Sequence, residues 1–552
     1  KTLAATNRLA SGIKKLAAFD LQSAQLVLRY TLPGKITHLL RTLPPSDTQA
    51  LARGFDEILT GTFCEMMGID RTRENTNAGV LPTADFVTAQ LRAPLARGGM
   101  GLTNMEKARD ACHVGGYFTT GYILATYPDL ADFAKCLEVP EDERDELCEV
   151  QAQLVQAVET LRRKIPEDDK EYASLEPVAF ARTVTAGTAR GQQKKLIEAT
   201  QTVPLREMGT FKDMARVDSL AAPGAQAYMQ TIPRTWKTRL NSSQIQISVL
   251  HALGLPLPIL ANVRQCCRGH PMDERGLHLI GVCCGLSSSG GLNGDGKAVR
   301  HDRLADSWCD IIKDAGHQIS REAQGMAGMP PNDRSDILVH NLRGPDMHID
   351  LTVRTVLTSD GSLASTCRQG VPGSVAEAAA KEKEAQYASL QGAEFQAIAH
   401  EQFGRMNKGG EEFLKQMAHD ETALRLGLHD HDEHPFYLGT YAKVLEKSRK
   451  VLSVGLARQN AECVLRGVKG AKMLRGAFAP AVNHDIDPEV PYSAVSQLVN
   501  EAAVAAARAR VPAPGGGGEA RATPTSAADG GGGGGGGRGG ESLARAAPLS
   551  TA

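Results

Sequence analysis

The sequence has no long apolar run and few aromatic side chains. No stretch of about 18 consecutive apolar residues occurs, so no membrane-spanning helix is expected. Aromatic residues make up only 5% of the chain, which is typical of a helix-rich protein. A basic segment followed by an apolar one is also missing, so the sequence predicts no targeting signal.

The chain also lacks net charge, with 62 Lys and Arg against 63 Asp and Glu. A nucleic-acid-binding protein of this composition needs local basic patches, because the global charge attracts no polyanion. The 11 cysteines include two adjacent pairs, Cys266-Cys267 and Cys283-Cys284. Because nothing in the sequence indicates secretion, we expect reduced thiols or metal ligands rather than disulfides.

The length of 552 residues is too great for one ordinary core. Composition and periodicity predict a mainly α protein with an embedded α/β domain and a disordered tail that contains eight consecutive glycines. The predicted regions are a helical region at 1–125, a helical linker at 126–260, a Cys/His-rich segment at 261–300, the α/β domain at 301–430, a helical extension at 431–510 and the tail at 511–552.

Apolar residues at helical spacing mark the N-terminal region. Leu21, Ala24 and Leu28 fit a period of about 3.6 residues, as do Ile36, Leu39 and Leu40 further on. Pro44-Pro45 is expected to end the second helix, and Ser46 or Asp47 to cap the next one. A further amphipathic helix is predicted at 141–165.

The α/β domain contains the most informative pattern. Helices are predicted at 301–316, 374–391 and 437–475, and strands at 335–341 and 347–353 around a turn at 343–346. Asp336 and Asp350 lie symmetrically about Arg343, so a turn centred there places the two carboxylates opposite each other. If the register shifts by a residue or two, they become diagonal neighbours.

Both aspartates lie in apolar strand sequence, where an unpaired carboxylate is costly. A divalent cation would relieve that cost and prefers hard oxygen ligands. The alternative is that each Asp caps a turn or pairs with a nearby arginine such as Arg334 or Arg354.

Lys383 and Tyr387 follow on a helix, one turn apart, and therefore share a face. A lysine beside two metal-binding carboxylates can orient or activate an attacking water and offset phosphate charge. The alternative is an ordinary solvated face of a Lys/Glu-rich helix.

The order of these motifs resembles the restriction-like endonuclease of non-LTR retrotransposons, a member of the PD-(D/E)XK nuclease group. The residues that carry the resemblance are Arg300-His301-Asp302, Glu322, Arg334-Ser335-Asp336, Ile349-Asp350-Leu351-Thr352-Val353 and Lys383-x-x-x-Tyr387.

The resemblance implies a catalytic set of Asp336, Asp350 and Lys383, with Glu322 as an acidic residue that often precedes the first strand. Asp336 and Asp350 would bind Mg²⁺ or Mn²⁺. The sequence departs from the family pattern at Ser335, where the family has Pro or Ala. It also has Thr352 at the usual lysine position, so the site depends on Lys383.

A second resemblance lies just upstream, where the Cys/His-rich segment is similar to a CCHC zinc knuckle. The spacing His278-x4-Cys283 suits a small zinc loop. The implied zinc ligands are Cys266, Cys267, His278 and Cys283. Two adjacent cysteines are awkward joint ligands, so His270 or Cys284 is a substitute; free core thiols are the alternative.

The N-terminal region resembles the part that follows the polymerase palm in algal and protist reverse-transcriptase-like proteins. The motifs concerned are Leu28-Arg29-Tyr30, Leu40-Arg41-Thr42-Leu43-Pro44-Pro45, Phe55-Asp56, Gln90-Leu91-Arg92-Ala93-Pro94-Leu95 and Gly98-Gly99-Met100-Gly101-Leu102. The Tyr/Phe-x-Asp-Asp of a polymerase palm does not occur in the sequence, so we expect no polymerase activity from this chain.

The expected function is therefore a metal-dependent DNA endonuclease of a retroelement protein. Its expected partners are DNA and the element's RNA, without a membrane, and the resemblance implies a nuclear location. The alternatives are a catalytically inactive nucleic-acid-binding remnant and a helical scaffold without any nucleic-acid role.

Overall fold

The structure of the chain is a computed structural model. The residues it describes are 1–70, 81–124, 139, 142–143, 147, 149–164, 196–197, 199–201, 205–266, 269–281, 296–324, 334–340, 344–389, 394–428 and 435–474. The chain divides into two units, Lys1–Phe478 and Ala479–Ala552. The second unit, with the predicted tail at 511–552, lies outside the described residues.

Helices dominate the N-terminal half, as predicted. In chain order they are α1 (Thr2–Ala17), α2 (Leu21–Thr31), α3 (Gly34–Thr42), α4 (Pro45–Met67), α5 (Ala84–Arg92), η1 (Leu95–Arg97), α6 (Met105–Leu124), α7 (Glu149–Lys164), α11 (Leu205–Met208), α12 (Phe211–Leu220), η4 (Ala227–Gln230), η5 (Trp236–Thr238), α13 (Ser242–Leu253), η6 (Pro258–Leu260) and α14 (Leu277–Gly281).

The buried faces of α2 and α3 follow the helical spacing that the sequence predicts. Leu21, Ala24 and Leu28 of α2 and Ile36 and Leu40 of α3 lie in one core cluster. The Asp20 side chain begins α2, because its carboxylate accepts a hydrogen bond from the backbone N–H of Ser23 at 2.9 Å. Among the described helices, none combines the length and the apolar composition that a membrane crossing requires.

The predicted cap of α4 was wrong. The helix begins at Pro45, with Pro44 as its N-cap, so Ser46 and Asp47 lie inside the first turn. Proline suits this position because the first helical N–H has no partner within the helix and the ring already fixes a helical φ. The two prolines therefore start α4 rather than only ending α3.

Within the described ranges, four strands form one mixed sheet in the order β1-β2-β3-β4. They are β1 (Gln318–Gln324), β2 (Arg334–His340), β3 (Met347–Arg354) and β4 (Glu394–Glu401). The β1–β2 and β2–β3 pairs are antiparallel, whereas β3 and β4 are parallel. Strands β2 and β3 confirm the two predicted strands; the sequence did not predict β1 or β4.

Helices cover both faces of the sheet. Ile337, Ile349 and Ile398 pack against Trp308 of α15 (Gly296–Asp314) and Met417 of α17 (Lys408–Leu426). The other face packs on α16 (Ser374–Gln386), the crossover between β3 and β4, through small side chains that permit close approach. This cluster consists of Ala376, Ala379, Ala380, Ala397 and Ala399.

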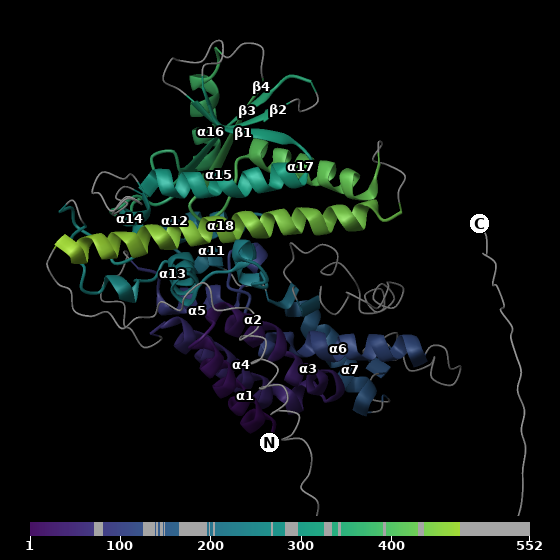
Figure 1. Cartoon of the computed structure of the whole chain (residues 1–552). Helices are drawn as coiled ribbons and strands as arrows, with labels where there is room; N and C mark the ends of the chain where they lie inside the picture. The colour runs from purple at the N-terminus through teal and green to yellow at the C-terminus, as the bar shows by residue number, and fades with distance from the viewer. Residues whose placement is uncertain are drawn as a thin grey trace, which may run out of the picture. The chain divides into compact units, whose positions relative to one another are not determined.

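The long helix α18 (Tyr437–Leu474) joins the sheet region to the N-terminal helices. It packs against α15 and α17 on one side and α13 on the other, and Figure 1 shows α15 lying between the sheet and α18. Gly455 permits the close approach of α15 and α18, because a Cβ atom there would lie 2.8 Å from Ser307 Oγ.

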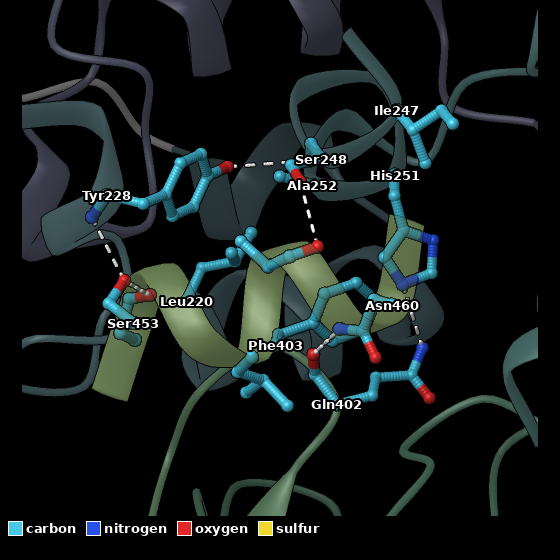
Figure 2. Close-up of a pocket in the computed structure, with 13 residues that line it drawn as sticks. Leu220, Tyr228, Ile247, Ser248, His251, Ala252, Gln402, Phe403, Ser453 and Asn460 are labelled. Atoms are coloured by element: carbon cyan, nitrogen blue, oxygen red, sulfur yellow. Dashed lines mark hydrogen bonds between the residues drawn. The ribbon is translucent and has the colours of Figure 1, made fainter. Parts of the chain in front are cut away.

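A cavity of about 30 Å³ lies where α13, α18 and the chain after β4 meet (Figure 2). Around it, the Asn460 side chain donates a hydrogen bond to the Gln402 carbonyl oxygen at 2.7 Å. The backbone N–H of Tyr228 donates to Ser453 Oγ at 3.0 Å. The first bond fixes the chain after β4 to α18, and the second fixes η4 to α18. Breaking either leaves a buried polar group without a partner.

We predict that Asp56 makes the stability of the protein depend on pH. Its carboxylate accepts hydrogen bonds from the backbone N–H groups of Met105 and Glu106, at 2.8 and 3.0 Å. Burial outweighs these bonds and raises its pKa from 3.8 to about 6. Because the folded pKa exceeds the unfolded one, the stability it contributes is complete below about pH 3.8 and is lost as pH rises through about 6.

The stability of the wild type relative to Asp56→Asn should therefore fall by about 3 kcal/mol between acidic and neutral pH. Urea unfolding at a series of pH values measures this difference. The exposed Asp47→Asn variant is the control and should show no such trend. A wild-type advantage over Asp56→Asn that stays constant with pH would contradict the prediction.

Candidate functional site

The β2–β3 pairing brings Asp336 and Asp350 together just beyond the end of the β2–β3 ladder. The last paired residues are Ile337 and Ile349, and the same register continued by one residue places Asp336 opposite Asp350. This is the register that the sequence predicted from the symmetry about Arg343. Beyond the last pair, the Asp336 carboxylate Oδ2 accepts a hydrogen bond from the backbone N–H of Leu351 at 2.6 Å.

Asp350 is a buried carboxylate, with 4% of its surface exposed. Burial raises its pKa, and the negative charge of Asp336 raises it further. Lys383 opposes both effects, since its Nζ lies 3.2 Å from Asp350 Oδ2. A hydrogen bond from Tyr387 also favours the charged carboxylate.

Helix α16 positions Lys383 and Tyr387 as the sequence predicted, on one face and one turn apart. Tyr387 is the C-cap of the helix. Its ring is buried and stacks on Phe395 of β4, with 4.6 Å between ring centroids. The Lys383 Nζ lies 6.0 Å from the centroid of the same ring. Tyr387 therefore limits where the lysine can go and keeps it beside Asp350.

His301 of α15 is a site residue to which the sequence assigned no role. Its Nε2 lies 2.8 Å from Asp336 Oδ2. Burial lowers the pKa of His301, but bonds and charges from Asp336 and Asp302 outweigh burial and raise it to about 8. The imidazole is thus cationic at neutral pH. The sequence feature that could have identified His301 is the motif Arg300-His301-Asp302, which lies in the helix before the first strand.

Glu322 is not brought into a three-ligand set with the two aspartates. It lies on β1, level with Asp336 in the register, but the pairing is interrupted there. Its φ is 52°, a left-handed conformation that is rare outside glycine, and the residue is exposed. Among the described residues, the one group of three His, Cys, Asp or Glu with ligand atoms within 4.8 Å of one another lies elsewhere.

The structure gives a reason for Ser335, where the resemblance expects Pro or Ala. Ser335 is fully buried, and its hydroxyl lies 2.8 Å from Nδ1 of the equally buried His348. The serine therefore satisfies a polar group inside the sheet region. Arg354, an alternative partner for the aspartates, instead pairs with Glu382 at 2.6 Å.

The predicted zinc segment also forms a cluster. Cys266, His270 and His278 place one ligand atom each within 4.8 Å of one another. A tight hairpin brings the first two together, since the backbone N–H of Cys266 donates to the His270 carbonyl at 2.9 Å. Of the predicted ligands, Cys267 and Cys283 lie outside the described residues, as does Cys284.

His278 is aimed into this cluster by the start of α14. The Asp273 carboxylate accepts hydrogen bonds from the backbone N–H groups of Leu277 and His278, at 2.9 and 2.7 Å. Burial lowers the pKa of His278, and the nearby His270 lowers it further, so the ring is neutral at pH 7. Its Nε2 is buried and lacks a hydrogen-bond partner among the described residues. A neutral imidazole nitrogen of this kind is the form that binds metals.

A scan against protein-family models and a search of curated proteins returned no match. The resemblance to non-LTR endonucleases therefore rests on the motifs of the chain. The structure adds to these motifs the arrangement of three side chains around Asp350, namely those of Asp336, Lys383 and Tyr387.

We predict that Ser335→Ala lowers the free energy of unfolding by about 1–3 kcal/mol, because it leaves His348 Nδ1 buried without a partner. Urea unfolding measures the loss. Ser46→Ala, at an exposed helix position, is the control and should change stability by less than about 0.5 kcal/mol. Equal stability of the two variants would show that the buried bond is not needed.

Proposed function

We propose that the chain is a metal-dependent DNA endonuclease whose active site contains Asp336, Asp350 and Lys383. The observation that carries the proposal is the placement of a buried carboxylate, Asp350, between a second carboxylate and a lysine. Two like charges this close favour a divalent cation as their shared partner. Lysine on the following helix is the feature that the family resemblance implied.

The donor set fits Mg²⁺ or Mn²⁺. Asp336 and Asp350 offer carboxylate oxygens, the hard ligands that these cations prefer. Within the described part of the chain, the Asp336 bonds to His301 and Leu351 both use Oδ2, which leaves Oδ1 for a ligand. When bound, such a cation activates water for attack and neutralises charge that develops on the phosphate.

The protein's own groups would then direct hydrolysis. Lys383 is placed to hydrogen-bond the attacking water or a phosphate oxygen, and the cationic His301 holds Asp336 in one orientation. The water oxygen forms a new bond to phosphorus as the bond to the leaving oxygen breaks. The attacking water loses one proton, and the leaving oxygen takes one up.

We also propose that Cys266, His270 and His278 bind a structural Zn²⁺. The unpartnered Nε2 of His278 supports this site, since a buried nitrogen without a hydrogen bond is satisfied by a metal. A tetrahedral site needs a fourth ligand, and the sequence offers Cys267, Cys283 or Cys284 for that place. His270 is thus a ligand where the sequence had named it only as a substitute.

The wider context of the proposal comes from the resemblance alone. The resemblance implies that the chain belongs to a retroelement protein located in the nucleus, with target DNA and element RNA as partners. Nicking of target DNA would prime reverse transcription in an intact element. An inactive nucleic-acid-binding remnant is the second candidate, because Glu322 does not complete a three-ligand set.

Asp350→Asn should reduce nicking of supercoiled plasmid in Mg²⁺ or Mn²⁺ by at least about a hundredfold, because the amide keeps the shape of the side chain but removes its charge. Conversion of supercoiled to open-circular DNA measures the rate. Asp346→Asn is the matched control: this residue lies in the turn between the strands, beside His340. No nicking by the wild type, under conditions where it binds DNA, would favour the inactive remnant.

The purified chain should contain about one zinc per molecule, and Cys266→Ser should lose it. Elemental analysis by mass spectrometry measures the metal content. Cys309→Ser is the control, because Cys309 is a buried cysteine of α15 in a different core cluster. Equal zinc in both variants, or none in the wild type, would refute the zinc site.

A further inference from the structure

A crevice with basic and aromatic walls lies on the α18 side of α15. It is lined by Trp236 and Lys237 of η5, Arg303 of α15 and Arg458 of α18. Trp236 has 65% of its surface exposed, whereas the other tryptophan of the chain, Trp308, is fully buried. A large exposed indole is unusual unless it contacts a partner.

Trp236 is held in place by its neighbours. An Arg458 nitrogen donates hydrogen bonds to the carbonyl oxygens of Trp236 and Arg239, both at 2.5 Å. The Arg458 guanidinium carbon lies 5.9 Å from the indole centroid, and Lys237 Nζ lies 6.0 Å from it. A fixed aromatic ring flanked by cations is the arrangement on which nucleic-acid bases stack.

Positive charge remains in this crevice after its own ion pairs are made. The two carboxylates on its walls are already paired: Asp306 with Arg321, which lies outside the crevice lining, and Asp310 with Lys237 of the same lining. Among the described residues, no carboxylate lies within ion-pair distance of Arg303 or Arg458. Burial lowers the pKa of Arg458, and the charge of Arg303 lowers it further, while Glu462 one turn along α18 partly opposes both effects. The two guanidinium groups are therefore close enough to repel each other.

The surrounding sequence adds to this charge. Residues 234–239 contain three Lys or Arg and no Asp or Glu, although the chain as a whole is nearly neutral. Two exposed residues, Ile232 and Arg234, lie just before Trp236. The segment therefore supplies a local basic and aromatic surface, which a nucleic-acid-binding protein of neutral composition needs.

We propose that this crevice, here called the Trp236 crevice, binds single-stranded nucleic acid. One base stacks on Trp236, and a backbone phosphate lies between Arg303 and Arg458. An unpaired strand is required because the bases of a duplex already stack on each other and offer no free face. The inference goes beyond the proposed nuclease, since neither Asp350 nor a metal takes part in this binding.

The crevice is well placed to hold one strand of a nucleic acid near the candidate active site. Helix α15 presents His301 to Asp336, and Arg303 lies only two residues further along the same helix. A nucleic-acid strand bound at Arg303 would have to cross about one helix diameter, on the order of 10 Å, to reach His301 and the candidate active site.

Tryptophan fluorescence tests the proposal directly, because Trp236 is the exposed tryptophan and Trp308 the buried one. Titration with oligo(dT) of about 12 nucleotides should quench the emission, since stacking places a base against the indole. Trp236→Phe should still bind but lose the quenching, because the remaining emission comes from Trp308. Unchanged emission of the wild type during binding would overturn the proposal.

Fluorescence anisotropy of labelled oligo(dT) gives the affinities. Trp236→Ala should weaken binding about tenfold or more, and the exposed Phe19→Ala control should not. Arg303→Gln should reduce the slope of log affinity against log salt by about 0.7, unlike the exposed Arg8→Gln control. Equal affinities of Trp236→Ala and wild type, or no binding of oligo(dT) or oligo(U), would overturn the proposal.

Oligo(U) in parallel distinguishes RNA from DNA: tighter binding of one of the two identifies it as the ligand. The Asp350→Asn variant should bind oligo(dT) as the wild type does. Loss of nicking and loss of single-strand binding are therefore separate outcomes, and either proposal can fail without the other.

Discussion

The buried charge of Asp350 and its balance by Lys383 are the constraint around which the sheet region is built. A carboxylate with 4% exposure is costly in an apolar setting unless cations or hydrogen bonds compensate it. Here the compensation comes from the helix that crosses from β3 to β4, so α16 must lie against the sheet closely enough for Lys383 to reach across. The alanine-rich interface of α16 and β4 permits that approach.

The cations and hydrogen bonds around Asp350 do not fully offset the cost of burying its carboxylate beside Asp336. This distinguishes the site from an ordinary structural ion pair. The negative charge of Asp336 raises the pKa of Asp350, while His301 and Leu351 both bond to the same oxygen of Asp336. A protein that needed only stability would be served as well by apolar residues at these positions. We propose that a bound cation supplies the remaining compensation for the two carboxylates.

The sequence predicted the placement of these side chains where local rules apply. The β2–β3 register followed from the symmetry of Asp336 and Asp350 about the turn, and the shared face of Lys383 and Tyr387 followed from helical spacing. Strand β1 was missed because its residues are mostly polar, and β4 because Ala397, Ala399 and the terminal Glu394 and Glu401 have little strand propensity. Both strands depend on pairing partners distant in sequence.

His301 and the partners of Ser335 could not be predicted for the same reason. The contact of His301 with Asp336 joins residues 35 positions apart, and no local pattern reports it. Pro44-Pro45 was misjudged because proline both ends one helix and starts the next. Of the zinc segment, the sequence predicted Cys266 and His278, whereas the hairpin that brings His270 beside Cys266 is visible only in the fold.

Electron paramagnetic resonance of bound Mn²⁺ tests the proposed cation site at Asp336 and Asp350 without a DNA substrate or catalytic turnover. We expect the wild-type chain and Asp346→Asn to bind Mn²⁺ at a site that Asp350→Asn lacks, in protein whose zinc content is unchanged. Equal Mn²⁺ binding by all three proteins would show that Asp336 and Asp350 do not form a cation site.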